Sequence, residues 1–261
     1  MPCRQFNVAA SPEYSLDSSA SLIGATGYPF TVNMWVFPEV IAGATPQVLF
    51  AFQDFAFSNA IDAFFQNGVL GMNFVVGGTA GTPTYCKLPV QTFARWYNVT
   101  LVGTSATQRR LYIGAYGAVG VNYVDDTSSA TLGSLAGTIL AGASVSGTVV
   151  DTFPGLLSEV GIWNAALTLG EIKQIARRQR LGLWVRPQSI KNFFPMGVSP
   201  SGDVDAITGL TLTSNGIVDP GYVPPWPICG NADPIRMRGF RVAGGGGGGG
   251  GSRRPVIQVC G

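Results

Sequence analysis

The sequence has no histidine and few charged residues. Only 11% of its 261 residues are Asp, Glu, Lys or Arg, whereas an average globular chain has about 25%. The lack of histidine excludes Ser-His and Cys-His nucleophile pairs and every histidine-containing metal site. The 14 carboxylates leave few positions for the acid pair of a glycosidase. We therefore expect a protein that is not an enzyme and that uses no cofactor and no metal ion.

The positive and negative charges nearly cancel. A net charge of +2 creates no long-range field toward nucleic acid or an anionic membrane. The uncharged stretch Thr127–Val150 has the length of a membrane span, but more than half of it is Ser, Thr and Gly, which predicts strand–turn–strand. Met1–Tyr14 has no apolar core of signal-peptide length. We expect no nucleic-acid partner, no membrane and no classical secretion.

Cysteine is also scarce. No two of Cys3, Cys86, Cys229 and Cys260 lie at the spacing of metal ligands, so no zinc site is expected. Cys3 and Cys260 lie at opposite ends of the chain, and a bridge between them is one alternative. The other alternative, which we favour, is that all four are reduced thiols.

Glycine, by contrast, is abundant, and short strand patterns follow one another. The chain has 36 glycines, together with many Pro, Ser and Thr residues. Residues 30–37 alternate between an apolar face and a mixed face that includes Trp35, and Pro38 ends them, which predicts an inner strand covered on both sides. Further strands are predicted over 47–57, 68–76, 84–88, 96–103, 109–113, 119–123 and 132–140.

One helix is predicted, from about Leu169 to Arg180. Thr168 and Glu171 form a capping box at its start, and Ile172, Ile175 and Ala176 follow at helical spacing. The basic residues at its end are Arg177, Arg178 and Arg180. One interpretation is an anion site. The other, which we favour, is that these solvated side chains interact with the negative end of the helix dipole.

Three segments, taken in order, resemble the laminin-G-like/concanavalin-like jelly roll. They are residues 30–36 (FTVNMWV), residues 93–101 with 110–114 (FARWYNVTL and RLYIG), and residues 153–172 (FPGLLSEVGIWNAALTLGEI). The chain departs from the family pattern at Asn98, where His is common, and at Ile113, where Asp or Asn is common.

The resemblance implies an all-β, two-sheet antiparallel jelly-roll sandwich with one short helix. It predicts that Trp35, Trp96 and Trp163 fill the space between the sheets rather than offer sugar-stacking platforms. Leu111 and Ile162 are expected in the same core. Family members that bind calcium use loop carboxylates, and the candidates here are Asp125, Asp126 and Asp151, although solvated turn acids explain them as well.

The C-terminal part differs in character from the rest. We predict a sandwich over residues 1–186, a strand-containing extension packed on it over 187–218, and an irregular, Pro- and Gly-rich arm over 219–261. Eight glycines from Gly244 to Gly251 precede the alternating segment Val256–Val259. We predict that the arm contacts another subunit, and its candidate assembly residues are Gly244, Gly251, Arg253, Arg254, Val256, Ile257 and Val259.

Fold alone does not choose the function. Low charge and the long arm favour a virion structural protein, most simply a bacteriophage capsid decoration or head-fibre protein assembled in the host cytoplasm. Its partners would be other capsid or fibre subunits and further copies of itself. The alternative is a carbohydrate-binding, lectin-like adhesion module that binds a surface glycan, including one on a tail fibre or baseplate. A hydrolase is the third class.

Overall fold

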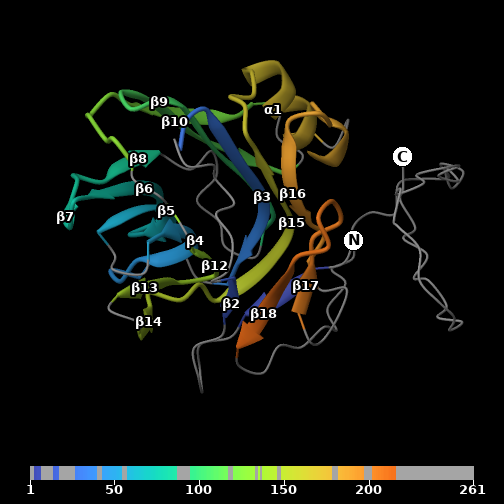
Figure 1. The fold of residues 1–261 in the computed structure, drawn as a ribbon, viewed down its shortest axis with the longest axis horizontal. Coiled ribbons are helices and arrows are strands. Elements are labelled where there is room, and N and C mark those ends of the chain that lie inside the picture. The colour runs from blue at the N-terminus through green and yellow to red at the C-terminus, as the bar shows by residue number, and fades with distance from the viewer. Residues whose placement is uncertain are drawn as a thin grey trace, which may run out of the picture. The chain divides into compact units, whose positions relative to one another are not determined.

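The computed structural model describes twelve stretches of the chain. They are residues 3–6, 14–17, 27–39, 43–54, 58–86, 95–116, 120–132, 135, 137–145, 148–177, 182–196 and 202–215. The chain divides into two compact units, Met1–Tyr222 and Val223–Gly261. All the described residues belong to the first unit, and the architecture below is that of this unit (Figure 1).

The first sheet has seven strands, in the order β1-β15-β3-β9-β10-β11, with β16 also paired to β15. One edge of β15 pairs with two strands in succession, β1 at Gly155–Leu157 and β16 at Val160–Trp163, while β3 occupies its other edge. The strands are β1 (Arg4–Phe6), β3 (Phe30–Pro38), β9 (Tyr97–Ser105), β10 (Gln108–Ala115), β11 (Asn122–Asp126), β15 (Gly155–Trp163) and β16 (Ile190–Phe194).

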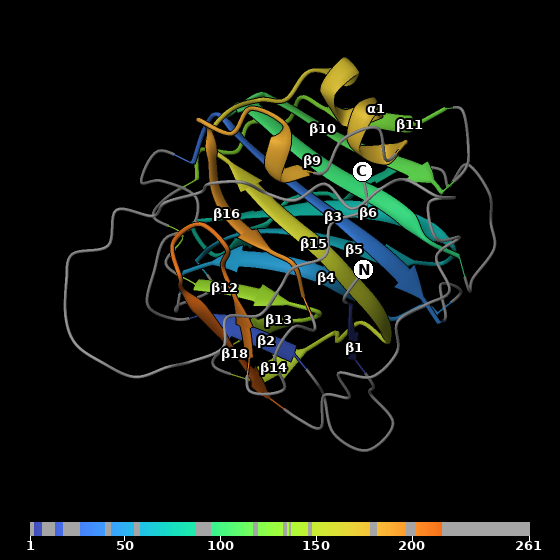
Figure 2. The ribbon, with the colours of Figure 1, turned by 90° about the vertical axis from the view of Figure 1, so that its right-hand side faces the viewer.

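The second sheet has nine strands, in the order β17-β18-β2-β12-β4-β5-β6-β7, with β8 also paired to β6. Figure 2 shows it behind the first sheet. All strand pairs among the described residues are antiparallel, which confirms the predicted jelly-roll sandwich. The strands are β2 (Tyr14–Asp17), β4 (Gln47–Gln53), β5 (Asn59–Gln66), β6 (Val69–Val76), β7 (Thr79–Ala80), β8 (Thr84–Cys86), β12 (Gly137–Leu140), β17 (Gly202–Val204) and β18 (Thr211–Asn215), besides a separate hairpin of β13 (Ala143–Val145) and β14 (Thr148–Val150).

The main core lies between the two sheets. Strand alternation sends one face of each inner strand into it, because successive side chains point to opposite sides. Strand β3 runs between β15 and β9 and is buried on both faces, as predicted. The inward-facing residues include Val32, Met34, Val99, Leu101, Leu111, Ile113, Phe52, Ile61, Phe65, Met72 and Ile162.

The three tryptophans are buried, but the prediction that they fill the space between the sheets is wrong. Trp35 shares the outer face of the first sheet with Asn33, because Met34 and Val36 point into the core. Trp163 packs against the helix on that outer face and donates its Nε1–H to the Val185 carbonyl at 2.8 Å. Trp96 contacts Phe37, also on the outer face, with ring centroids 5.5 Å apart. Leu111 and Ile162 do lie in the core between the sheets.

The single α-helix of the described residues is α1 (Leu169–Ala176). The predicted capping box is confirmed: Thr168 Oγ1 accepts from the Glu171 amide, and the Thr168 amide donates to Glu171 Oε2 at 2.7 Å. A cap of this kind contributes about 1 kcal/mol. The helix ends earlier than predicted, with Arg177 as C-cap, and residues 178–181 lie outside the described residues. Ile172 and Ile175 pack on the outer face of the first sheet.

Several predicted strands shift. The strand predicted over 47–57 ends at Gln53, and β5 was not predicted at all. Asp54, the residue after β4, accepts from the Ser58 amide at 2.7 Å and from Asn59 Nδ2 at 2.9 Å, next to the start of β5. Strand β11 begins later than the 119–123 prediction, and β12 is shorter than the 132–140 prediction. None of the described helices has the length and apolar character needed to cross a membrane.

The segment after residue 186 contributes strands to both sheets. Strand β16 extends the first sheet, and β17 and β18 extend the second. The division at residues 186 and 218 stays a prediction. The arm from 219 to 261 lies outside the described residues, as do Cys229 and Cys260, whereas Cys3 and Cys86 are buried.

Candidate functional site

The exposed aromatic surface of the first sheet lies along β10 and β11. In their register Arg110 stands opposite Asp125, and Tyr112 stands opposite Tyr123. Leu111 points into the core, so these four side chains project from the outer face. We name the four residues the tyrosine ridge.

The ridge is held together by ionic and aromatic contacts. Arg110 and Asp125 form a bidentate ion pair in which Nη2 donates to Oδ2 at 2.8 Å and Nε donates to Oδ1. The hydrogen bond to Asp125 raises the pKa of Arg110. The Arg110 guanidinium lies 4.4 Å from the Tyr123 ring centroid, and the Tyr112 and Tyr123 rings are 5.8 Å apart.

The two tyrosines differ in exposure. Tyr123 is 52% exposed, whereas Tyr112 is only 5% exposed because it packs against the residues of α1. The Asp125 and Arg110 side chains are 47% and 37% exposed. The ridge therefore presents one accessible ring, bounded by a charged pair on one side and by a buried ring on the other.

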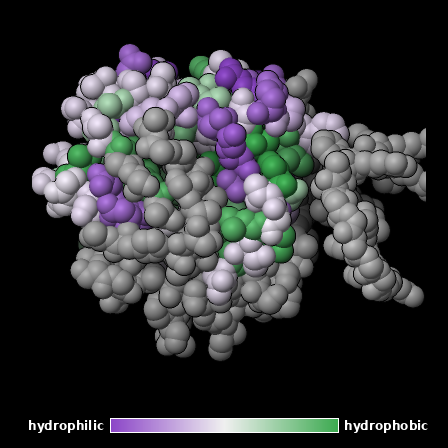
Figure 3. Space-filling view, viewed as in Figure 1, coloured by the Kyte–Doolittle hydropathy of each residue, from purple (hydrophilic) through white to green (hydrophobic). Residues whose placement is uncertain are grey.

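Beside the ridge, the end of β10 and the start of the β11 segment pack closely against α1 and leave no room for a ligand. The residues at this contact are Gly114, Ala115, Gly120, Val121, Lys173, Ala176 and Arg177. Gly114 allows the close approach of its neighbours, since a Cβ there would lie 2.6 Å from Val121 Cγ1 and 3.4 Å from Ala176 Cβ. Figure 3 shows hydrophilic residues gathered over the α1 end of the molecule.

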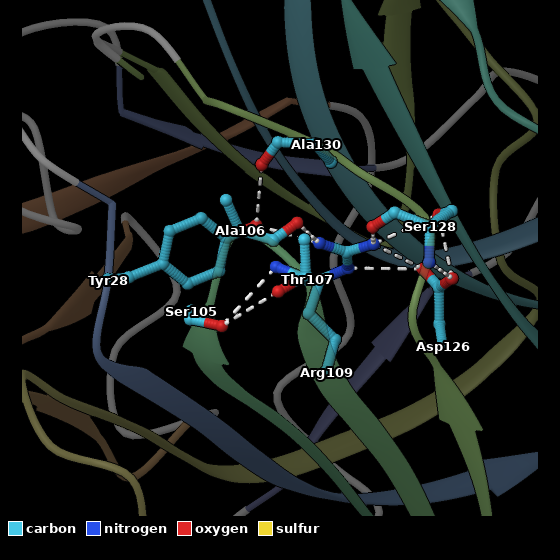
Figure 4. A network of polar contacts seen from close by, with 8 residues as sticks. All are labelled: Tyr28, Ser105, Ala106, Thr107, Arg109, Asp126, Ser128 and Ala130. Carbon is cyan, nitrogen blue, oxygen red and sulfur yellow. Dashed lines mark hydrogen bonds and ion pairs between the residues drawn. The ribbon is translucent and has the colours of Figure 1, made fainter.

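A buried arginine supports the ridge from the core side (Figure 4). Arg109 donates to Asp126 Oδ2 from Nε at 3.1 Å and from Nη2 at 2.8 Å, and it also donates to the Ala106 and Ser128 carbonyls. Its guanidinium lies 4.3 Å from the ring of Phe74 on β6. Arg109 thereby ties β10 and β11 to the second sheet and fixes the strands that carry the ridge.

The charge of Asp126 is stabilised within this network. Burial works to raise the pKa of Asp126, but hydrogen bonds from the Ser128 hydroxyl and amide and from Arg109 outweigh it, and the pKa is lowered. The Ser128 hydroxyl donates at 2.7 Å and the amide at 2.9 Å. Asp126 therefore remains ionised as the partner of Arg109.

The carboxylates considered as calcium ligands are not brought together. Asp125 and Asp126 each pair with an arginine of β10. Asp151 lies beside the second sheet, where its carbonyl accepts from the Val48 amide at 2.7 Å. Among the stretches that the structure describes, no three His, Cys, Asp or Glu side chains form a group able to hold a metal ion. Asp125 and Asp126 instead serve as ion-pair partners of Arg110 and Arg109.

A buried acid on the second sheet was missed by the sequence reasoning. Asp62 of β5 stands opposite Asn73 of β6, and it is 7% exposed. Burial, assisted by the charge of Asp151, raises the pKa of Asp62 to about 7. Asp62 Oδ1 and Asn73 Oδ1 are both buried without a hydrogen-bond partner. A pKa near 7 is typical of a catalytic acid. In this conformation, however, the buried Asp62 side chain is not accessible to a substrate.

The assembly residues predicted on the arm lie outside the described residues. These are Gly244, Gly251, Arg253, Arg254, Val256, Ile257 and Val259. Of the ridge residues only Asp125 was predicted in a site, as a calcium ligand, and the ridge itself was not predicted, because Arg110 and Asp125 are brought together only by the register of β10 and β11.

Several solved structures of different kinds of protein share this fold. A candidate carbohydrate binding protein from Bacteroides ovatus has 17% identity and a TM-score of 0.56, with 84% of this chain and 60% of that chain covered. NanB in complex with Optactamide has 17% identity and a TM-score of 0.53, with coverage of 67% and 27%. Full-length tailspike protein 2 of Escherichia coli O157:H7 bacteriophage CAB120 has 13% identity and a TM-score of 0.52, with coverage of 75% and 26%.

At these identities the likeness extends to the fold alone, and this chain spans less than two thirds of each of the three proteins. A search of curated proteins finds no match. A laminin G family profile, described as the concanavalin A-like lectin/glucanases superfamily, matches residues 12–173, which is more than half of the chain. The matched residues include most strands of both sheets and the start of α1, and the chain belongs to the concanavalin A-like lectin/glucanases superfamily.

Proposed function

We propose that the chain is a non-enzymatic, lectin-like module that binds a glycan on the tyrosine ridge. The observation that carries this proposal is the exposed ring of Tyr123, held in place by the guanidinium of Arg110. A tyrosine ring offers an apolar face for the C–H face of a sugar and a hydroxyl for its polar edge. Arg110 and Asp125 add a donor and an acceptor beside the ring, as small-ligand sites require.

The charges of the ridge fit binding better than catalysis. Asp125 is its only carboxylate, and this carboxylate is paired with Arg110 rather than placed opposite a second acid. Glycoside hydrolysis uses two carboxyl groups about 5–9.5 Å apart. The sequence offers no histidine as an alternative base. The fold shared with a candidate carbohydrate binding protein supports the same choice.

Replacing Tyr123 with alanine is expected to weaken glycan binding at least about tenfold, because a central aromatic contact is removed. Tyr85→Ala is the matched control, since Tyr85 is 45% exposed but lies on the second sheet. A glycan array would identify a binding saccharide, and isothermal titration would then compare the two variants. Equal affinity of wild type and Tyr123→Ala, or no binding on the array, contradicts the proposal.

The proposal includes a virion setting. The chain would be part of a bacteriophage particle assembled in the host cytoplasm, either as a capsid decoration or head-fibre protein or on a tail fibre or baseplate. The low charge and the Pro- and Gly-rich arm support this, and the fold shared with a phage tailspike agrees with it. The partners would be like subunits and other virion proteins.

In that setting, deleting residues 244–261 should leave the sandwich folded but lower its incorporation into the particle. The eight glycines let a neighbour approach the backbone closely, and residues 256–259 alternate as a strand does when it joins a sheet edge. Quantitative mass spectrometry of purified particles would give the copy number of full-length and truncated chains. Unchanged copy number would show that the arm is not an anchor.

A further inference from the structure

Only one face of the Tyr123 ring is open to a ligand. The Arg110 guanidinium, which comes from β10, lies over the ring at 4.4 Å from its centroid. The Tyr112 ring, also on β10, lies 5.8 Å away at an angle of 48°. The side of the Tyr123 ring toward β10 is therefore covered. Because Tyr123 is nevertheless 52% exposed, its accessible face points away from β10.

This free face lies at the edge of the first sheet. In the part of the chain that the structure describes, β11 is the last strand of the sheet and pairs only with β10 (Figure 2). An edge strand presents backbone N–H and C=O groups that no neighbouring strand pairs. A ligand on the free face of Tyr123 would therefore meet an apolar ring next to backbone hydrogen-bonding groups.

The neighbours of Tyr123 along β11 limit what the free face can hold. Side chains two residues apart share one face of a strand and lie about 7 Å apart. In one direction, at Val121, the chain packs against α1 and leaves no room for a ligand. In the other direction Asp125 is bound to Arg110. Tyr112 offers no second platform, because it is 5% exposed. The ridge therefore provides one aromatic platform, enough for one sugar ring.

The two charges beside the ring cancel each other. Arg110 Nη2 donates to Asp125 Oδ2 at 2.8 Å, and the two side chains are 37% and 47% exposed. Both groups can make further hydrogen bonds, since a guanidinium has five N–H donors and a carboxylate about four lone-pair sites. A sugar hydroxyl can bond to either group. A charged substituent, by contrast, would be attracted by one group and repelled by the other, so the pair favours an uncharged sugar.

We propose that the tyrosine ridge binds a single uncharged sugar residue, stacked on the free face of Tyr123 at the edge of β11, while the rest of the glycan stays in solvent. The proposal rests on the glycan-binding function above and specifies its ligand class. Two consequences are measurable. Affinity does not depend on the length of the glycan, and the Arg110–Asp125 pair suppresses any preference for charge.

The first test lengthens the ligand. Isothermal titration of the full-length protein would use three neutral series, a β-1,4-glucan, a β-1,4-galactan and an α-1,6-mannan, each from the methyl monosaccharide to the tetrasaccharide. In a series that binds, the dissociation constants should agree within about threefold. A larger gain in affinity with length would indicate a second sugar subsite and overturn the inference.

The second test changes only the charge of the sugar. The methyl uronates of glucose, galactose and mannose would be compared with the corresponding uronamides, which have the same shape. Wild type should bind both members of a pair within about twofold. Asp125→Asn leaves Arg110 unpaired and should favour the uronate, whereas Arg110→Gln leaves Asp125 unpaired and should favour the uronamide. The uronate-to-uronamide ratios of the two variants should differ by about fivefold, as expected for exposed charges.

Lys191→Gln is the matched control, because Lys191 is exposed on β16, away from the ridge, and its loss should leave the ratio unchanged. Far-UV circular dichroism checks that each variant keeps its fold. A wild-type preference above twofold for either member, or equal ratios in Asp125→Asn and Arg110→Gln, would overturn the inference and leave the proposed function standing. If no saccharide of these series or of the array binds wild type, the proposed function itself fails.

Discussion

Replacing Asp203 with alanine is expected to destabilise the folded protein by about 3–5 kcal/mol, the usual cost of removing one partner of a buried ion pair. Asp203 of β17 pairs with Arg4 Nε of β1, and both side chains are fully buried. The substitution leaves the guanidinium in a low-dielectric site without this carboxylate. Urea unfolding should show a lower midpoint with an unchanged slope.

The matched control is Asp125→Ala, which breaks the exposed pair with Arg110. Because water already screens that pair, its loss should cost about 1 kcal/mol or less. If Asp203→Ala is no more damaging than Asp125→Ala, the buried pair between β1 and β17 does not hold the two strands together in solution.

The second large effect is a loss of stability as pH rises from about 4 to about 7, caused by Asp62. The folded pKa of Asp62 is about 7, whereas an unfolded Asp has a pKa of about 3.9. The folded state thus holds a proton that the unfolded state releases. The stabilisation is fully present below about pH 4, falls as pH rises through the folded pKa, and amounts to about 4 kcal/mol over three units.

Asp62→Asn should remove this dependence, because the amide cannot ionise. From pH 4 to pH 8 the unfolding free energy of wild type should fall relative to that of Asp62→Asn. Above pH 8 the difference between the two should stay constant. Chemical unfolding at five or six pH values would measure it, with Asp125→Asn as an exposed control. A difference that does not vary with pH would mean that Asp62 has an ordinary pKa.

Local features of the fold could be predicted from the sequence. The capping box at Thr168 needs only a hydroxyl and a carboxylate three residues apart, so the helix start was predicted correctly. The alternation around Met34 likewise predicted an inner strand. These predictions are reliable because the interacting groups are neighbours along the chain.

Assignments that depend on tertiary placement were less successful. Alternation separates Met34 from Trp35, but it does not say which face meets the second sheet and which meets α1. For that reason the tryptophans were placed on the wrong side. Strand β5 was not predicted because the acidic Asp62 interrupts its apolar residues. The burial of Asp62 is explained only by the position of β5 between β4 and β6.

The candidate site depends on register. Arg110 and Asp125 are 15 residues apart and become partners because β10 and β11 pair in one particular alignment. A shift of one residue would send Tyr123 into the core and Val124 outward. The strand register could not be predicted from the sequence pattern. Tyrosines close to arginines in neighbouring predicted strands are nevertheless a sequence signal that a search for sugar-binding surfaces could use.

The shared edge of β15 has a consequence for how the chain reaches its native state. The first strand, β1, and the late strand β16 pair with the same edge of β15, and Arg4 pairs with Asp203 across 199 positions of sequence. Contacts of such wide separation require closure of very long loops before they contribute any stability. Chains dominated by such pairings fold slowly, in milliseconds to seconds. During synthesis on a ribosome, β1 could pair with β15 only after most of the sandwich had been synthesised.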